Sequence, residues 1–101
     1  MDITIKTQGT ETIVTFNGRL DTPAAQQAAA QLEPIQEKAG GTIILDCKDL
    51  TYISSSGLRI FLVLRKAASQ NGGTVIVRSI GRDIRNVFMM TGFLNLFQIE
   101  D

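Results

Sequence analysis

Residues 46–64 read DCKDLTYISSSGLRIFLVL, and they decide how the rest of the chain is interpreted. A short apolar strand, predicted over Thr42–Cys47, leads through a tight loop into three consecutive serines and a glycine. A helix predicted over Ser55–Gln70 follows, and it is apolar enough to be buried. The first N–H groups of a helix lack intrahelical partners and, together with the helix dipole, favour negative charge. Three roles are therefore open to a serine here: helix cap, nucleophile, or acceptor of a phosphoryl group.

The composition is that of an ordinary globular protein, with 44% hydrophobic and 20% charged residues. We expect residues 1–101 to form a single domain, because a chain of this length holds one core and is too small for two. Ten basic residues balance ten acidic ones, so charge gives no reason to expect a nucleic acid or an anionic membrane as partner.

The sequence also bears on location. No apolar run approaches the ~20 residues that cross a bilayer, and the N-terminus lacks the pattern of a signal peptide, so we expect no direct membrane insertion. The single cysteine, Cys47, lies at the end of an apolar run. It is interpreted as a core thiol in a reducing compartment, which predicts a cytoplasmic protein.

The hydrophobic pattern predicts strands alternating with helices. Ile3–Thr7 and Ile13–Phe16 form a hairpin. A helix starts with Thr22 as N-cap before Pro23, and its apolar stripe runs to Ala39. The remaining predicted elements are strand 42–47, helix 55–70, strand 74–78, a helix ending at Gly92 and strand 94–99. The order β-β-α-β-α-β-α-β predicts an α/β fold, with a mixed sheet of four to five strands whose central strands are parallel and packed by helices.

The chain contains no histidine, which excludes several kinds of site. A Ser-His-Asp triad needs an imidazole to carry the proton, and histidine-based metal sites are excluded as well. Residues 53–57 read ISSSG instead of the G-x-S-x-G of a nucleophile elbow, and neither a P-loop nor a dinucleotide fingerprint occurs. We therefore predict a protein that is not an enzyme, with no catalytic residue, no metal site and no cofactor.

Taken alone, the residues leave the role of the serines open. Ser54 or Ser55 as N-cap would contribute about 1 kcal/mol, and helix starts prefer serine for that reason alone. Ser56 and Gly57 could be small only because the start of the helix packs close to the sheet. Spacing and composition favour this structural interpretation over a functional one.

Two aspartates have two interpretations each. Asp21 follows the second predicted strand, and Asp46 ends the third. Since parallel strands end at one edge of a sheet, where sites usually form, both carboxylates are expected near the serines. Each could equally be a turn or capping residue that binds nearby backbone N–H groups.

The segment Asp46–Leu64 resembles the signature of STAS domains, the bacterial anti-sigma factor antagonists and their relatives. Members carry a strand ending in aspartate, a short loop, and then [Asp/Ser/Thr]-Ser-[Ser/Ala]-Gly-Leu opening a helix. Gly18–Asp21 is similar to the family's Gly-x-Leu-Asp segment after the second strand. Gly72-Gly73 before a Val/Ile strand, and Val87-Phe88 with Thr91–Phe93, also fit. The resemblance covers nearly the whole chain and implies the STAS-like fold.

The resemblance implies that Ser55 is a phosphoacceptor. Ser54 takes the place where many members have aspartate. The unphosphorylated protein would bind an anti-sigma factor that is a GHKL-type serine kinase and so release the sigma factor. Phosphorylation of Ser55 would end this binding, and a PP2C-like phosphatase would reset the cycle. The other residues implied to form the partner-binding site are Asp21, Asp46, Ser54, Ser56 and Gly57.

Alternatives with the same fold remain. The chain could be a non-phosphorylated STAS subunit of a membrane transport complex of the lipid ABC transporter type. A stressosome-like scaffold is less favoured, because such proteins usually have further domains. We favour the anti-sigma factor antagonist and expect a monomer. Many members add a C-terminal helix after the last strand, and we expect it to be absent or short here.

Overall fold

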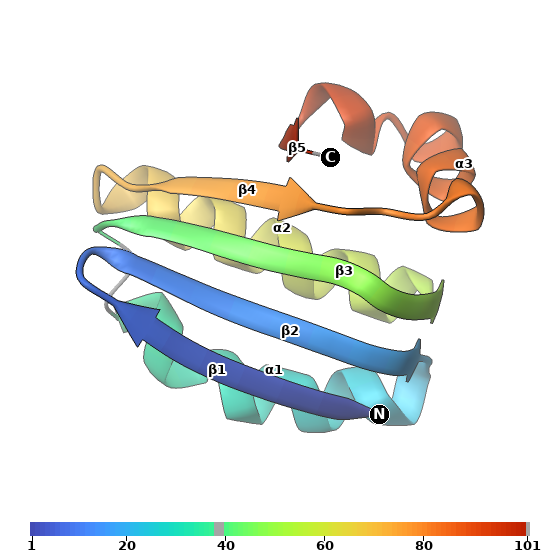
Figure 1. Ribbon diagram of the computed structural model, residues 1–101, viewed down its shortest axis with the longest axis horizontal. Coiled ribbons are helices and arrows are strands. Elements are labelled where there is room, and N and C mark those ends of the chain that lie inside the picture. The colour runs from blue at the N-terminus through green and yellow to red at the C-terminus, as the bar shows by residue number, and fades with distance from the viewer. Residues whose placement is uncertain (38–39, 101) are drawn as a thin grey trace.

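Nine elements follow one another along the chain, and the structure, a computed structural model, describes residues 1–37 and 40–100. The elements are β1 (Asp2–Gln8), β2 (Glu11–Leu20), α1 (Thr22–Glu37), β3 (Thr42–Ile53), α2 (Ser55–Gln70), β4 (Thr74–Arg78), α3 (Arg82–Thr91), the 3-10 helix η1 (Phe93–Asn95) and β5 (Gln98–Glu100). The strands form one sheet in the order β1-β2-β3-β4-β5 (Figure 1). In the described part of the chain the β1–β2 pair is antiparallel and the other strand pairs are parallel, so the predicted mixed α/β sheet with parallel central strands is confirmed.

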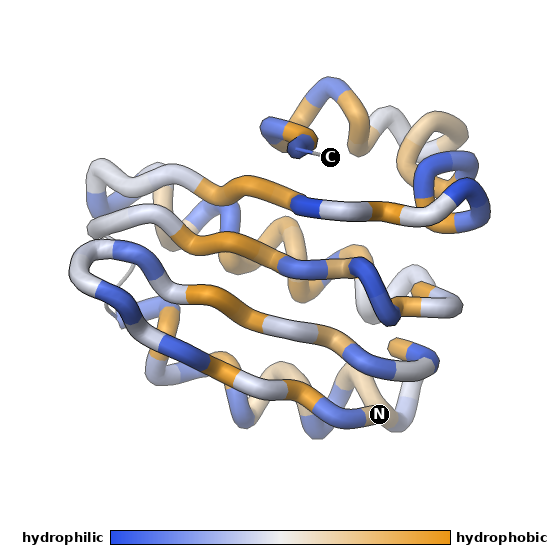
Figure 2. Tube along the Cα trace, in the orientation of Figure 1, coloured by the Kyte–Doolittle hydropathy of each residue, from blue (hydrophilic) through white to orange (hydrophobic). Residues whose placement is uncertain are grey.

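The core lies between the sheet and helices α1 and α2, which run side by side behind it in Figure 1. Hydrophobic residues concentrate in the middle of β2, β3 and β4 (Figure 2). On β2 and β4 the buried residues alternate, as in Val14 and Phe16 or Val75 and Val77. All five phenylalanines join this core, with ring centroids of neighbouring pairs 5.4 to 6.3 Å apart.

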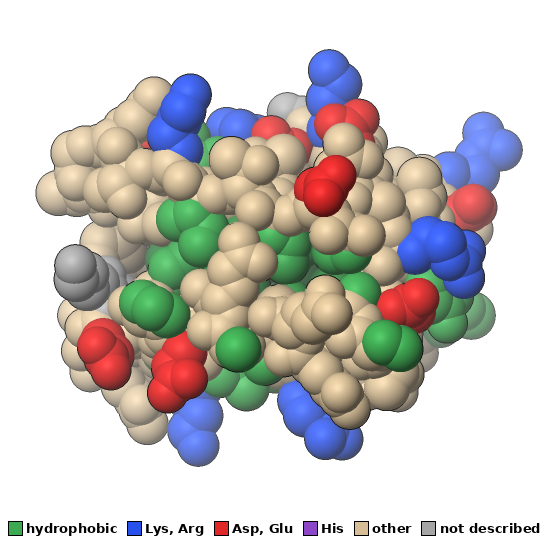
Figure 3. All heavy atoms as spheres, turned by 90° about the horizontal axis from the view of Figure 1, so that it is seen from below, with side chains coloured by type: hydrophobic (Ala, Val, Ile, Leu, Met, Phe, Trp, Pro, Cys, Tyr) green, Lys and Arg blue, Asp and Glu red, His purple; other side chains and the backbone are tan. Residues whose placement is uncertain are grey.

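Helix α1 also contacts β1, the outer strand of the sheet. Figure 3 looks at this side and shows hydrophobic side chains in a band across its middle. Ile3 of β1 packs against the core, and its carbonyl oxygen accepts a hydrogen bond of 3.0 Å from Nε2 of Gln31 on α1. The outer strand is thus attached to the helix layer by both an apolar and a polar contact.

Strand β3 extends well beyond the predicted Thr42–Cys47 and reaches Ile53. Its pairing with β2 contains two register shifts along this stretch. The buried residues Cys47, Leu50 and Ile53 consequently lie three apart instead of two. Bulges disrupt the alternation by which a strand is recognised in sequence, so the predicted loop is a bulged strand.

Strand β2 likewise extends beyond the predicted Ile13–Phe16 and continues through Asn17–Arg19, where the run of apolar residues stops in the sequence. Gly18 has φ of 116° at this point, a conformation that favours glycine. One of the two register shifts lies between Gly18 and Arg19. The sequence break is therefore an irregularity within the strand and not its end.

The start of α1 and the end of the chain also differ from prediction. Asp21, not Thr22, caps α1, since its Oδ1 accepts a hydrogen bond of 3.0 Å from the N–H of Ala24. The predicted end at Ala39 lies outside the described residues. In place of strand 94–99 there are η1 and the short β5, because Phe93 and Phe97 are both buried and the Phe97 N–H donates to the Phe93 carbonyl at 3.2 Å.

Candidate functional site

The parallel strands β2 and β3 end side by side, with Leu20 paired to Ile53. Ser54, the residue that follows β3, is held at this edge by two hydrogen bonds to the Leu20 carbonyl oxygen. Its backbone N–H and its hydroxyl each donate at 2.9 Å. Because Asp21 directly follows Leu20, the structure brings Asp21 and the serine segment to the same edge, as the sequence predicts.

Ser54 is the N-cap of α2. Its Oγ accepts a hydrogen bond of 3.1 Å from the N–H of Gly57, and its backbone is extended, with φ of −86° and ψ of 171°. Its carbonyl accepts the first helical bond, from the N–H of Leu58 at 2.9 Å. Only 9% of Ser54 is exposed. The capping role that the sequence left open between two serines therefore belongs to Ser54.

Gly57 is small because α2 begins very close to the sheet. A Cβ at this position would lie 2.9 Å from side-chain carbons of both Leu20 and Ile53. Real Cβ atoms essentially never approach other carbons so closely. Gly57 thus positions the first turn of α2 against the ends of β2 and β3.

Ser55 and Ser56 differ from Ser54 in exposure and in contacts. Ser55 is exposed at the first position of α2, and Ser56 is half-buried. Among residues 1–37 and 40–100, neither hydroxyl makes a hydrogen bond. Of the three serines, Ser55 is therefore the one whose hydroxyl is both exposed and without a structural role.

Two helix N-termini meet at this edge, because α1 begins after β2 and α2 begins after β3. Asp21 caps α1 as Ser54 caps α2. The positive ends of both helix dipoles and the first N–H groups favour an anionic group here. The Asp21 carboxylate already supplies one negative charge at this edge.

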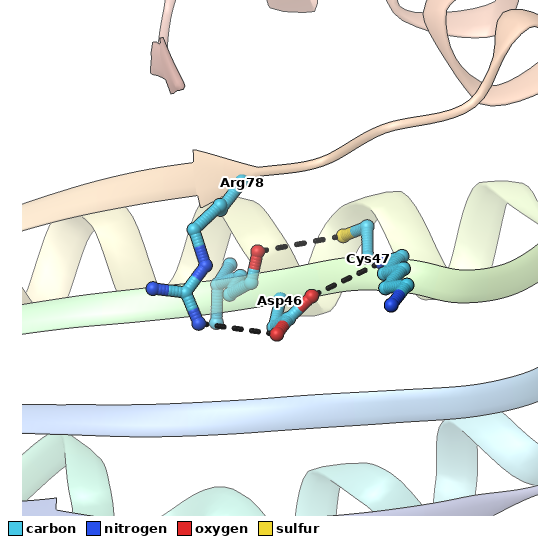
Figure 4. A network of polar contacts seen from close by, with 5 residues as sticks. Asp46, Cys47 and Arg78 are labelled. Atoms are coloured by element: carbon cyan, nitrogen blue, oxygen red, sulfur yellow. Dashed lines mark hydrogen bonds and ion pairs between the residues drawn. The ribbon is translucent and has the colours of Figure 1, made fainter. Parts of the chain in front are cut away.

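Asp46 does not belong to this edge. It lies in the middle of β3, eight residues before Ser54, which corresponds to about 20 Å or more along the strand. Its Oδ2 forms an ion pair of 3.1 Å with Arg78 of β4, and its Oδ1 accepts from the N–H of Lys48 at 3.1 Å (Figure 4). The expectation that Asp46 ends its strand and lies beside the serines is wrong.

The partner of Asp46, Arg78, carries a signal that sequence reasoning did not use. Thr42–Asp46 and Thr74–Arg78 are parallel runs of equal length that end in opposite charges. In the structure Asp46 and Arg78 are register partners. Two such runs, paired in parallel from their first residues, predict this ion pair.

Cys47 is the buried core thiol that the sequence predicts. Its Sγ donates to the Leu45 carbonyl at 3.6 Å (Figure 4). Burial, and secondarily the negative charge of Asp46, raise the pKa of the Cys47 thiol to about 12. The thiol is therefore protonated and unreactive at neutral pH.

The described residues contain no group of three or more side chains placed to hold a metal ion, and no helix among them has the length and apolarity to span a membrane. Two arginines, Arg19 and Arg59, are close in sequence to the residues of this edge. Arg19 stacks over the ring of Tyr52, with 4.3 Å between Cζ and the centroid, just before both strands end. Arg59 is exposed on α2, one turn after Ser55.

Proteins of similar sequence include two named as anti-sigma factor antagonists. BtrV of Bordetella bronchiseptica, a candidate antagonist by name, is 32% identical over 89 residues, which cover 88% of this chain and 77% of that protein. The anti-sigma F factor antagonist of Paenibacillus polymyxa is 30% identical over 90 residues, with 88% and 77% covered.

Solved structures show the same fold. A candidate anti-sigma factor antagonist from Thermotoga maritima matches with a TM-score of 0.89 at 20% identity, covering 98% of this chain and 86% of that one. The Bacillus cell fate determinant SpoIIAA in its phosphorylated form matches with a TM-score of 0.78 at 20% identity, covering 99% and 91%. The model of the STAS domain family matches residues 2–101. The chain belongs to the STAS domain family.

Proposed function

We propose that this protein is a cytoplasmic anti-sigma factor antagonist whose binding is switched off by phosphorylation of Ser55. It acts as a binding protein and not as an enzyme. The names of its relatives support the antagonist role, and the existence of a phosphorylated form of SpoIIAA supports control by phosphate. In its unphosphorylated form the protein binds an anti-sigma factor of the GHKL serine-kinase type, which then releases its sigma factor.

The observation that carries the proposal is that the three serines differ in exposure and in the hydrogen bonds of their hydroxyls. Ser54 is buried and uses its hydroxyl as both donor and acceptor to hold the start of α2. Ser56 is half-buried. Ser55 is exposed, and a kinase reaches its hydroxyl without unfolding the helix. A phosphate on Ser55 therefore leaves the structural contacts of the edge in place.

The switch is electrostatic. The kinase transfers the γ-phosphoryl group of ATP to the Ser55 Oγ, which loses its proton, and a PP2C-like phosphatase removes the group by hydrolysis. A phosphoserine adds about −1.5 to −2 charges at neutral pH. The N-terminus of α2 stabilises that charge, so the fold persists. The Asp21 carboxylate and the phosphate together make this edge repel a partner surface that accepts the neutral serine.

Phosphorylation by the cognate kinase tests the acceptor. The wild type, Ser55→Ala and Ser56→Ala are incubated with ATP and the cognate GHKL-type anti-sigma factor kinase, and intact mass is measured. The wild type and Ser56→Ala should each gain one phosphate, and Ser55→Ala none. Equal labelling of the wild type and Ser55→Ala would show that Ser55 is not the acceptor.

Binding tests the charge switch separately. Ser55→Asp introduces a negative charge, whereas Ser55→Asn has nearly the same shape without it. Ser55→Asp should bind the kinase at least tenfold more weakly than Ser55→Asn, while both unfold at about the same urea concentration. Equal affinities of the two variants would exclude the charge-switch mechanism even if Ser55 is phosphorylated.

A further inference from the structure

Helices α1 and α2 leave a groove of about 320 Å³ between their N-terminal halves. This α1–α2 groove begins at the same edge as the serine segment, because Ser56 forms part of its wall. Its other walls are largely apolar. They include Ala25 and Ala29 of α1 and Arg59, Ile60 and Val63 of α2.

The α1 side of the groove is uncharged. From Thr22 to Leu32 the helix has no ionisable side chain, although Gln26 and Ala29 are exposed. Surface helices ordinarily carry charged residues on the face turned to solvent. A neutral exposed face of this kind loses less hydration free energy than a charged face when another protein covers it. Val63 on the opposite wall, 40% exposed, adds apolar surface that a partner can bury.

Among the described residues that line this groove, Arg59 alone is ionisable. It is exposed, and among residues 1–37 and 40–100 it forms no ion pair. An apolar groove with one unpaired guanidinium is complementary to an aliphatic side chain that has a carboxylate next to it. Arginine binds carboxylates with charge-assisted hydrogen bonds, often two in parallel.

We infer that the α1–α2 groove receives a segment of the anti-sigma factor that carries an aliphatic side chain beside a carboxylate, and that Arg59 binds this carboxylate. The inference rests on the proposed function, because it places part of the kinase's docking surface next to the serine that the kinase phosphorylates. Ser56 belongs both to the groove wall and to the serine segment, so one partner surface covers the groove and Ser55 together.

Arg59 in the groove is also placed to bind a phosphate on Ser55. Ser55 and Arg59 are four residues apart on α2, a spacing that places side chains next to each other on a helix. A phosphate on Ser55 pairs with Arg59 and so removes the cation that the partner's carboxylate needs. It also repels that carboxylate directly. Phosphorylation therefore weakens docking in the groove without any movement of the helices.

Binding measurements on groove variants test the inference. Ala29→Glu puts a carboxylate on the groove wall, and Ala30→Glu puts the same charge on the exposed neighbour outside it. Arg59→Gln removes the guanidinium, with Lys66→Gln, exposed on α2 outside the groove, as its control. The kinase should bind Ala29→Glu and Arg59→Gln about tenfold or more weakly than wild type, and both controls within about twofold.

A second measurement addresses Arg59 in the switch. The ratio of the two dissociation constants, phosphorylated over unphosphorylated, should be smaller by about tenfold in Arg59→Gln than in wild type. If Ala29→Glu and Arg59→Gln bind the kinase as tightly as wild type does, and Ser55 is labelled normally, this inference is overturned and the proposed function remains intact. If the kinase neither binds nor labels the wild-type protein, the proposed function is overturned, and this inference with it.

Discussion

The backbone N–H and the hydroxyl of Ser54 both donate to the carbonyl oxygen of Leu20, each at 2.9 Å. The same hydroxyl accepts a hydrogen bond from the N–H of Gly57. Ser54 therefore joins the end of β2 to the start of α2, and the adjacent Ser55 has no such contact. Under the proposed function, the structural and regulatory roles belong to neighbouring serines, so the two roles can be separated by mutation.

Ser54→Ala should lower the free energy of unfolding by about 2 kcal/mol. The substitution removes the N-cap, which contributes about 1 kcal/mol, and a second buried hydrogen bond of similar value. Ser55→Ala should change the free energy by less than about 0.5 kcal/mol, since the side chain is exposed and its hydroxyl makes no hydrogen bond within the described part of the chain. Urea unfolding of the wild type and both variants measures the difference. Equal midpoints for the two variants would show that Ser54 does not anchor α2.

Gly57→Ala should destabilise the protein by about 1–3 kcal/mol, because its Cβ would overlap Leu20 and Ile53 and force the first turn of α2 away from the sheet. Helix propensity alone predicts the opposite sign, a gain of about 1 kcal/mol from replacing a helical glycine by alanine. Ser56→Ala, one position earlier, is the control and should be nearly neutral. A Gly57→Ala protein as stable as wild type would mean that the helix start is less closely packed than described.

Much of the fold follows from the sequence because its signals are local. The bounds of α2 and β4 and the glycine at the end of α3 agree with prediction, since apolar periodicity, Asn71–Gly73 and Gly92 mark them. Those signals depend on residues only a few positions apart. The parallel order of the central strands also follows, from the alternation of strands with helices.

The errors have a different origin, namely contacts between distant residues. The bulges of β3 arise in its pairing with β2, so the spacing of Cys47, Leu50 and Ile53 looks like a loop in isolation. The same error placed Asp46 at a strand end and hence at the serine edge. Likewise, no local signal shows that α1 and α2 leave a groove, because it depends on how two helices pack.

Asp46→Asn should leave phosphorylation of Ser55 unchanged and cost no more than about 1 kcal/mol of stability. Its carboxylate pairs with Arg78, and both side chains are partly exposed, which limits the value of such a pair. A double-mutant cycle with Arg78→Gln measures the pair.

Asp21→Asn is the contrasting variant, because asparagine caps a helix as well as aspartate does. Asp21→Asn should retain stability but reduce the effect of phosphorylation on binding. Slower phosphorylation of Asp46→Asn than of wild type would instead show that Asp46 contributes to the site.

Cys47 should make the protein less stable at alkaline pH. Burial, with Asp46 as the smaller cause, raises the pKa of its thiol from 9.0 to about 12 in the folded state. Between these values the unfolded chain loses the thiol proton while the folded protein keeps it. Stability from this group is therefore fully present below pH 9 and is lost as the pH rises toward 12, by about 1.4 kcal/mol per pH unit.

Cys47→Ala isolates this contribution, because the two proteins differ only at this side chain. At neutral pH the variant should be the less stable of the two, since a buried side chain is shortened. Urea unfolding from pH 8 to about pH 11 should then show the difference shrinking as the pH rises, because only the wild type must keep a thiol protonated on folding. A constant difference across this range would mean that the Cys47 thiol ionises equally easily in the folded and unfolded states, and that it is not enclosed by the core.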